Sequence, residues 1–71
     1  MDVQMEEGIV DLNSAQKEQL MELPGIGETK AEAILSYREE VGRFQTIEDL
    51  KNVSGIKESV FEKIKDKIIV R

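Results

Sequence analysis

The chain repeats itself at an offset of 30 residues, and this repeat limits the folds open to it more than any other feature. Residues 18–34 align with residues 48–64 without a gap, and seven of the seventeen aligned pairs are identical. The identical pairs are Glu18 and Glu48, Leu20 and Leu50, Gly25 and Gly55, Ile26 and Ile56, Glu28 and Glu58, Glu32 and Glu62, and Ile34 and Ile64. Repeats of such a period are typical of small helical units that each bury one face against a neighbour. Two copies are too few for a solenoid, so we expect one closed unit of two hairpins related by a pseudo-twofold axis.

The spacing of apolar residues predicts an all-α fold in which both hairpins share one core. The expected helices cover residues 14–22, 28–40, 47–52 and 58–67. Asn13 with Gln16, and Thr46 with Asp49, have the spacing of capping boxes at the starts of the first and third helices. Phe44, which lies between the two halves, is expected to plug the core. No pair of strands is predicted.

The two ends of the chain are expected to differ from this helical centre. Residues 1–9 are polar and acidic without periodicity, so we expect a flexible acidic N-terminal tail there. Residues 10–71 are expected to form one domain of two tandem helical hairpins, because no linker-like segment interrupts residues 12–68. An extended arm should begin at Val10, and Ile69 and Val70 should form an extended closing tail.

The first hairpin turn has the composition of an anion-binding site. Its sequence is Leu23-Pro24-Gly25-Ile26-Gly27-Glu28-Thr29-Lys30-Ala31. Gly25 permits the tight turn, Ile26 anchors the tip in the core, and Gly27 leaves space for a phosphate oxygen. The amides of Gly27 to Lys30 begin a helix, where unpaired N–H groups and the helix dipole favour an anion. Thr29 adds a hydroxyl group and Lys30 a positive charge, although a tight turn that serves only the fold is the alternative.

The second hairpin turn is a weaker copy of the first. It uses the corresponding residues Gly55, Ile56, Lys57 and Ser59. Lys57 stands where the first copy has Gly27, so its Cβ restricts the approach of the backbone to a phosphate, while its ammonium group can offset that loss. The residues leave two interpretations open, a second phosphate contact or a hairpin that only completes the fold.

Charge and composition narrow the functions further. Ten basic against fifteen acidic residues give a net charge of −5, which argues against a general basic nucleic-acid-binding face. Glu28 and Glu58 stabilise the helix dipoles if their side chains turn outward, but they would repel a phosphate beside them. Cysteine and histidine are absent, which removes disulfides, thiol catalysis and most zinc sites. We expect no catalytic residue, metal or cofactor, because 71 residues leave little room for an enzyme cavity.

The segment Leu23-Pro24-Gly25-Ile26-Gly27, followed by Ala31, resembles the helix-hairpin-helix motif, whose hairpin grips a nucleic-acid backbone without reading its sequence. Residues 10–70 are similar, more narrowly, to the C-terminal domain of ComEA-type competence proteins. The segments that carry this likeness include Asp11-Leu12-Asn13-Ser14-Ala15, Tyr37-Arg38-Glu39-Glu40, Gly42-Arg43-Phe44 and Ile47-Glu48-Asp49-Leu50. The resemblance implies a tandem helix-hairpin-helix domain that serves as a receptor for double-stranded DNA. The chain departs from the family at Lys57, where glycine is usual, and at Ser59, where a basic residue is frequent.

Two functions follow from these observations. The first is sequence-independent binding of double-stranded DNA through backbone phosphates on the minor-groove side, with no small-molecule substrate. The site residues are Gly25, Ile26, Gly27, Thr29, Lys30, Gly55, Ile56, Lys57 and Ser59. The resemblance implies that this is the receptor domain of competence and DNA uptake. It also implies an excised soluble domain from the extracellular or periplasmic face of the cytoplasmic membrane. Other competence or membrane uptake proteins are then expected as further partners. The alternative is a protein-interaction or dimerisation module with little DNA affinity, which an exposed apolar patch at Ile68, Ile69 and Val70 would favour.

Overall fold

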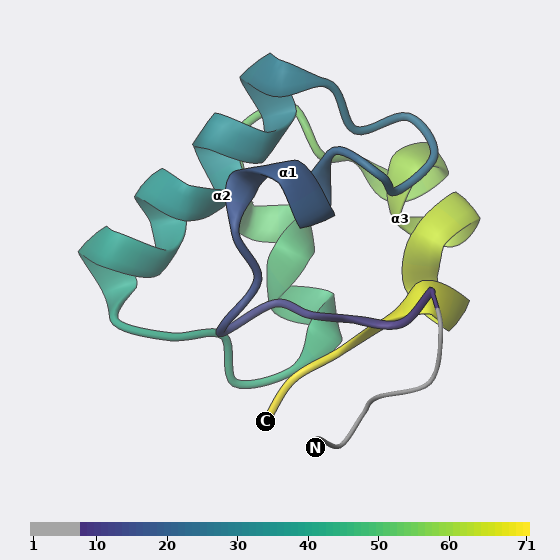
Figure 1. Ribbon diagram of the computed structural model, residues 1–71. Helices are drawn as coiled ribbons and strands as arrows, with labels where there is room; N and C mark the ends of the chain where they lie inside the picture. Colours follow the sequence, from purple (N-terminus) through teal and green to yellow (C-terminus); the bar gives the residue numbers. More distant parts are fainter. Residues whose placement is uncertain (1–7) are drawn as a thin grey trace.

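The computed structural model describes residues 8–71, in which short helices surround a single core (Figure 1). In chain order the elements are β1 (Val10–Asp11), α1 (Lys17–Leu20), α2 (Glu28–Val41), the 3₁₀ helix η1 (Ile47–Asn52), α3 (Glu58–Ile64), the 3₁₀ helix η2 (Lys65–Lys67) and β2 (Ile68–Ile69). The protein is therefore mostly helical, as predicted. The tail expected at residues 1–9 lies outside the described residues except for Gly8 and Ile9. No helix in the described part of the chain is both long enough and apolar enough to cross a membrane.

The prediction that no strands would pair was wrong, because β1 and β2 form a small parallel sheet. Val10 is paired with Ile68, and Asp11 with Ile69. Figure 1 shows this pair where the purple and yellow ends of the chain run side by side. Strands of two residues are too short to carry an alternating pattern, so their pairing depends on the fold bringing the ends together. The extended arm and closing tail that the sequence suggested are the two partners of this sheet.

The first helix is shorter than predicted and begins at a different residue. α1 covers only Lys17–Leu20, whereas a helix was expected over residues 14–22 with Asn13 as its N-cap. Gln16 is the N-cap, and its backbone N–H donates to Oε1 of Gln19 at 3.1 Å. Asn13 cannot serve as the cap because its side chain is engaged by a residue far away in the sequence.

Asn13 ties the segment before α1 to the connection between α2 and η1. Its Oδ1 accepts a hydrogen bond from the backbone N–H of Phe44 at 2.6 Å, and its Nδ2 donates to the carbonyl oxygen of the same residue at 3.0 Å. The predicted capping box of η1 is present in this region, because the N–H of Thr46 donates to Oδ2 of Asp49 at 3.3 Å. Local spacing thus predicted the N-cap of η1 correctly. It did not predict the N-cap of α1, because the side chain of Asn13 is bonded to a distant part of the chain.

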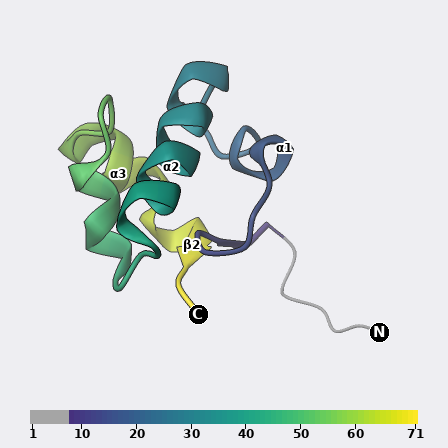
Figure 2. The ribbon, with the colours of Figure 1, turned by 90° about the vertical axis from the view of Figure 1, so that its left-hand side faces the viewer.

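One core joins both halves of the repeat. The largest fully buried side chains are Phe44, Leu12, Leu20, Ile34, Leu50, Ile56 and Ile64. Phe44 lies among them as the predicted plug, and the ring of Tyr37 stacks on it with the ring centres 4.9 Å apart. Arg38 donates to the carbonyl oxygens of Leu12 and Ala15, both at 2.9 Å, and so holds the segment before α1 against α2. Figure 2 shows α2 between α1 on one side and α3 on the other.

Candidate nucleic-acid interface

The first hairpin turn connects α1 to α2 and is built around Gly25. This glycine has a φ of +82°, in the left-handed region that residues with a side chain rarely adopt. The turn closes where the N–H of Ile26 donates to the carbonyl oxygen of Leu23 at 3.1 Å. The side chain of Ile26 is only 3% exposed, so it anchors the tip of the turn in the core as predicted. This anchor fixes the direction in which the following backbone enters α2.

The backbone amides that follow this turn have no partner inside the protein. Gly27 is the N-cap of α2, and its carbonyl oxygen accepts the first hydrogen bond of the helix from the N–H of Ala31 at 2.9 Å. Within residues 8–71, no protein acceptor receives the N–H groups of Gly27, Glu28, Thr29 or Lys30. These are the unpaired donors at the positive end of a helix of 14 residues. The arrangement can hold an anion such as a phosphate.

Gly27 differs from Gly25 because the fold does not need a glycine there. Its φ is −95°, which any residue can adopt, and a Cβ built at this position would have no atom within 4 Å. The second hairpin also shows that this position does not require a glycine, because Lys57 is the equivalent N-cap of α3 and has a φ of −113°. A Cβ at Gly27 would therefore enter open space at the N-cap of α2, next to the free amides.

The second turn repeats the backbone geometry of the first. Gly55 has a φ of +89°, and the N–H of Ile56 donates to the carbonyl oxygen of Val53 at 3.0 Å. Ile56 is 2% exposed, and the carbonyl oxygen of Lys57 accepts from the N–H of Phe61 at 2.9 Å. The same pattern of buried and exposed residues runs through both turns. The 30-residue repeat of the sequence is therefore a repeat of local structure as well.

The two turns lie next to each other in the upper part of the molecule in Figure 1. A Cβ on Gly55 would stand 3.8 Å from Cγ of Lys30, so the stem of this lysine passes along the second turn. Lys57, Thr29 and Ser59 are exposed, and Lys30 is half-buried. No carboxylate within residues 8–71 forms an ion pair with Lys30 or Lys57. The structure thus brings residues of both predicted turns together, with Ile26 and Ile56 as buried anchors.

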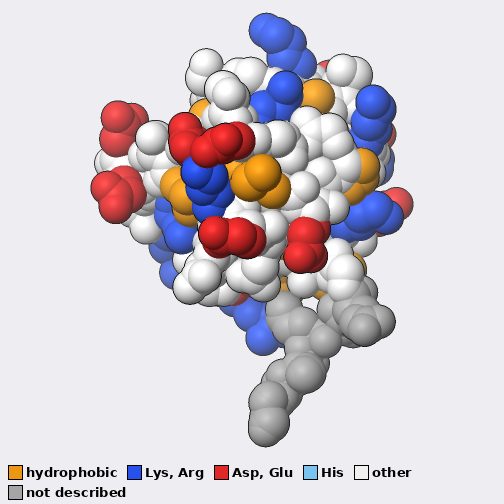
Figure 3. Space-filling model, turned by 45° about the horizontal axis from the view of Figure 1, so that its top comes forward, with side chains coloured by type: hydrophobic (Ala, Val, Ile, Leu, Met, Phe, Trp, Pro, Cys, Tyr) orange, Lys and Arg blue, Asp and Glu red, His pale blue; other side chains and the backbone are white. Residues whose placement is uncertain are grey.

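The two first-turn glutamates are paired with lysines from the preceding helices, which the sequence did not indicate. Nζ of Lys17 lies 2.9 Å from Oε2 of Glu28 and 2.9 Å from Oε2 of Glu32. In the second hairpin, Nζ of Lys51 lies 3.3 Å from Oε1 of Glu58. The hydrogen bond from Lys17 holds the pKa of the Glu28 carboxyl below its ordinary value, and both bonds raise the pKa of Lys17. The surface around the turns therefore carries mixed charge, as Figure 3 shows, and not a continuous basic face.

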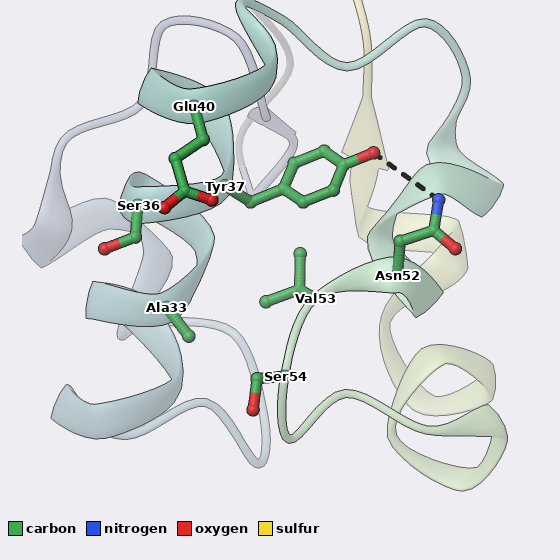
Figure 4. Close-up of a pocket in the computed structure, with 7 residues that line it drawn as sticks. All are labelled: Ala33, Ser36, Tyr37, Glu40, Asn52, Val53 and Ser54. Carbon is green, nitrogen blue, oxygen red and sulfur yellow. Dashed lines mark hydrogen bonds between the residues drawn. The ribbon is translucent and has the colours of Figure 1, made fainter.

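A shallow cavity of about 370 Å³ lies beside the second turn, between α2 and η1. Its walls are formed by Ala33, Ser36, Tyr37, Glu40, Asn52, Val53 and Ser54 (Figure 4). The Tyr37 hydroxyl accepts a hydrogen bond from Nδ2 of Asn52 at 3.4 Å across this cavity. In the described residues, no group of three or more acidic side chains is placed to hold a metal ion.

The apolar C-terminal residues do not form the exposed patch that a docking module would need. Ile68 is buried, and Ile69 and Val70 are half-buried, because β2 packs against β1. Among residues 8–71, the exposed large apolar side chains are Met21 and Val41. The observation that would have favoured the interaction module is therefore absent from this part of the chain.

Comparison with known proteins identifies the family. A sequence profile described as the helix-hairpin-helix motif matches residues 6–69. The chain belongs to the helix-hairpin-helix family. It is 57% identical over 63 residues to ComE operon protein 1 of Bacillus subtilis (strain 168), which confirms the predicted ComEA-type helix-hairpin-helix domain.

Two further relatives match a similar share of the chain. The chain is 41% identical over 61 residues to the human endonuclease/exonuclease/phosphatase family domain-containing protein 1. It is also 43% identical over 61 residues to an uncharacterized protein of Haemophilus influenzae. These matches cover 86% and 84% of this chain, and the Bacillus match covers 89%. The chain spans only 31% of the Bacillus protein, 11% of the human protein and 54% of the Haemophilus protein.

Proposed function

We propose that this helix-hairpin-helix domain binds double-stranded DNA without reading its sequence, by holding backbone phosphates on the minor-groove side. The observation that carries the proposal is the start of α2. Four N–H groups, from Gly27 to Lys30, lack acceptors within residues 8–71, and the space around a Cβ built on Gly27 is open. Phosphate contacts of this kind position a protein on a duplex but carry no sequence information.

The proposed interface includes both turns, arranged as a tandem pair about a pseudo-twofold axis. The repeated torsion angles at Gly25 and Gly55 and the repeated burial pattern support this arrangement. In the first turn the backbone amides, Thr29 and Lys30 contact the phosphate, while in the second Lys57 supplies an ammonium group with Ser59 beside it. Ile26 and Ile56 act by anchoring, since their side chains are buried and their amides close the turns.

The net acidity of the chain does not contradict this proposal. Asp2, Glu6 and Glu7 precede the domain, so residues 8–71 contain twelve acidic and ten basic side chains. Backbone amides hold an anion through partial charges, which need no excess of lysine. Affinity at such a site should be modest, and long-range attraction to DNA should be weak.

We further propose that residues 10–71 are a non-enzymatic receptor domain in competence and DNA uptake, with residues 1–9 as a separate acidic segment. The similarity to ComE operon protein 1 supports this role, and the shared domain is a minor part of that protein. In this role the domain lies on the extracellular or periplasmic side of the cytoplasmic membrane. Other competence or membrane uptake proteins are its further partners.

A polarisation titration with labelled DNA tests the binding proposal. The probes are two 20-base-pair duplexes of unrelated sequence and one single strand, each at several salt concentrations. We expect equal affinity for the two duplexes and a fall of about 0.9 log units in affinity per log unit of salt for each phosphate contact. Binding that ignores salt, strong preference for one duplex, or no binding at low salt would contradict the proposal. Light scattering on the same sample tests the alternative, because a dimerisation module would show twice the monomer mass in the absence of DNA.

A further inference from the structure

The repeated glutamates at the starts of α2 and α3 pose a problem for any site that holds phosphates. Glu28 and Glu58 stand in the first turns of these helices, and Glu32 and Glu62 follow one turn later. A free carboxylate beside the unpaired amides competes with a phosphate for the same donors and repels it. The repeat places this repulsion in both hairpins, so its removal matters for the proposed function on which this inference rests.

The structure shows how the first of these carboxylates is turned aside. Lys17, the first residue of α1, lies between Glu28 and Glu32 and donates to both at 2.9 Å. Its side chain is 32% exposed, whereas the two glutamate side chains are 65% and 58% exposed. The lysine is therefore the more fixed member of the group, and it draws both carboxylates toward α1.

The second hairpin has the same kind of pair, built from a different position. Nζ of Lys51 lies 3.3 Å from Glu58, and it also lies 4.8 Å from the centre of the Phe61 ring, which holds it in place. At the 30-residue offset, however, Lys51 aligns with Met21 and Lys17 aligns with Ile47. The pairing does not follow from the sequence repeat, because the two lysines are not equivalent. Both hairpins nevertheless pair their first-turn glutamate with a lysine of the preceding helix.

We propose that Lys17 is a positioning residue of the first phosphate-binding turn. It holds the carboxylates of Glu28 and Glu32 against α1 and offsets one of their two negative charges, so that a phosphate can reach the amides from Gly27 to Lys30. Lys51 has the same role toward Glu58 in the second turn. Neither lysine needs to contact DNA for this effect, which distinguishes them from Lys30 and Lys57.

The test compares four variants in the DNA titration: Lys17→Met, Lys17→Arg, Glu28→Gln/Glu32→Gln, and the triple variant that combines Lys17→Met with both glutamine substitutions. We expect Lys17→Met to weaken binding at low salt about three- to tenfold, from the repulsion of uncovered carboxylates about one Debye length or less from the phosphate. Lys17→Arg should keep most of the affinity. The triple variant should recover the affinity of the wild-type protein, although it lacks the same ion pairs as Lys17→Met.

Lys67→Met is the matched control for the loss of one positive charge, since no carboxylate within residues 8–71 pairs with Lys67. Circular dichroism melts establish that each variant is folded at the temperature of the titration. If the triple variant binds as weakly as Lys17→Met, the lysine contacts DNA directly and the inference is overturned. Unchanged binding by Lys17→Met would overturn it as well. Absence of binding by the wild-type protein would instead remove the proposed function, and this inference with it.

Discussion

Replacing Gly27 by aspartate should abolish most of the DNA binding while leaving the fold intact. Gly27 is the N-cap of α2, its φ is −95°, and a Cβ there would meet no atom within 4 Å. Aspartate and asparagine are at least as good as glycine at an N-cap, because their side chains accept hydrogen bonds from the free amides. The free energy of unfolding should therefore stay within about 0.5 kcal/mol of the wild-type value, or rise slightly.

The effect on binding should be much larger than the effect on stability. An aspartate at this position would place a negative charge beside a phosphate held by the following amides, at a separation of about 5 Å, where the two charges repel each other. The Coulomb energy of two such charges is about 1 kcal/mol in bulk water and about 3 kcal/mol at the effective dielectric constant of a protein surface. The dissociation constant for DNA should rise by a factor of about 5 to 150.

Gly27→Asn is the matched control, because asparagine has nearly the same size and capping ability without the charge. It should bind more weakly than the wild-type protein, since its side chain occupies the approach to the amides, but more tightly than Gly27→Asp. Polarisation titrations at three salt concentrations, together with thermal melts, measure both quantities. If Gly27→Asp binds DNA as tightly as the wild-type protein while remaining folded, the start of α2 is not the phosphate site and the reasoning fails.

Other substitutions test the second turn and the supports of the fold. Lys57→Gly should reduce the salt dependence of DNA binding by about 0.9 log units, and an unchanged slope would show that the second hairpin only completes the fold. Gly55→Ala, at a φ of +89°, should cost about 1 kcal/mol and lower Tm by about 4–8 °C in a calorimetric scan; an unchanged Tm would contradict the argument from backbone strain. Arg38→Met should cost about 2 kcal/mol in urea unfolding, because it leaves the two carbonyl groups before α1 without their charged donor, and a loss below 0.5 kcal/mol would show that water replaces it. The pKa of Glu28 is lowered below its ordinary value of 4.5 by Lys17, so the carboxylate stabilises the fold above this pH. The stability difference between the wild-type protein and Glu28→Gln should therefore shrink as the pH falls below 4.5, which urea unfolding across that range can measure.

The features that the sequence predicted correctly are those that depend on neighbouring residues. The glycines at 25 and 55 mark the two turns because only a residue without a Cβ adopts their positive φ at low cost. The capping box of Thr46 and Asp49 was visible because its two residues are three positions apart. Phe44 was identified as a core residue because it is a large apolar side chain in an otherwise polar connection.

The features that the sequence did not reveal depend on residues that are distant along the chain. Asn13 has the right spacing to cap a helix, yet its side chain forms hydrogen bonds with the backbone of Phe44, 31 residues away. α1 begins later, with Gln16 as its N-cap. The pairing of β1 with β2 joins the two ends of the domain, and strands this short have no alternating pattern of apolar and polar residues that could predict it. In both cases the structure depends on contacts between residues that lie far apart in the sequence.

The sequence by itself determined where the chain turns, that Ile26 and Phe44 are buried, and that the two turns are copies of one another. Only the tertiary structure decided which charged groups meet, and this determines whether an acidic chain leaves its helix starts open to a phosphate. Lys17 reaches Glu28 across 11 positions of sequence, and no helical or strand period connects them. Backbone torsions are set by sterics between adjacent residues, whereas ion pairs are set by distance in space, which the chain acquires only once it has folded.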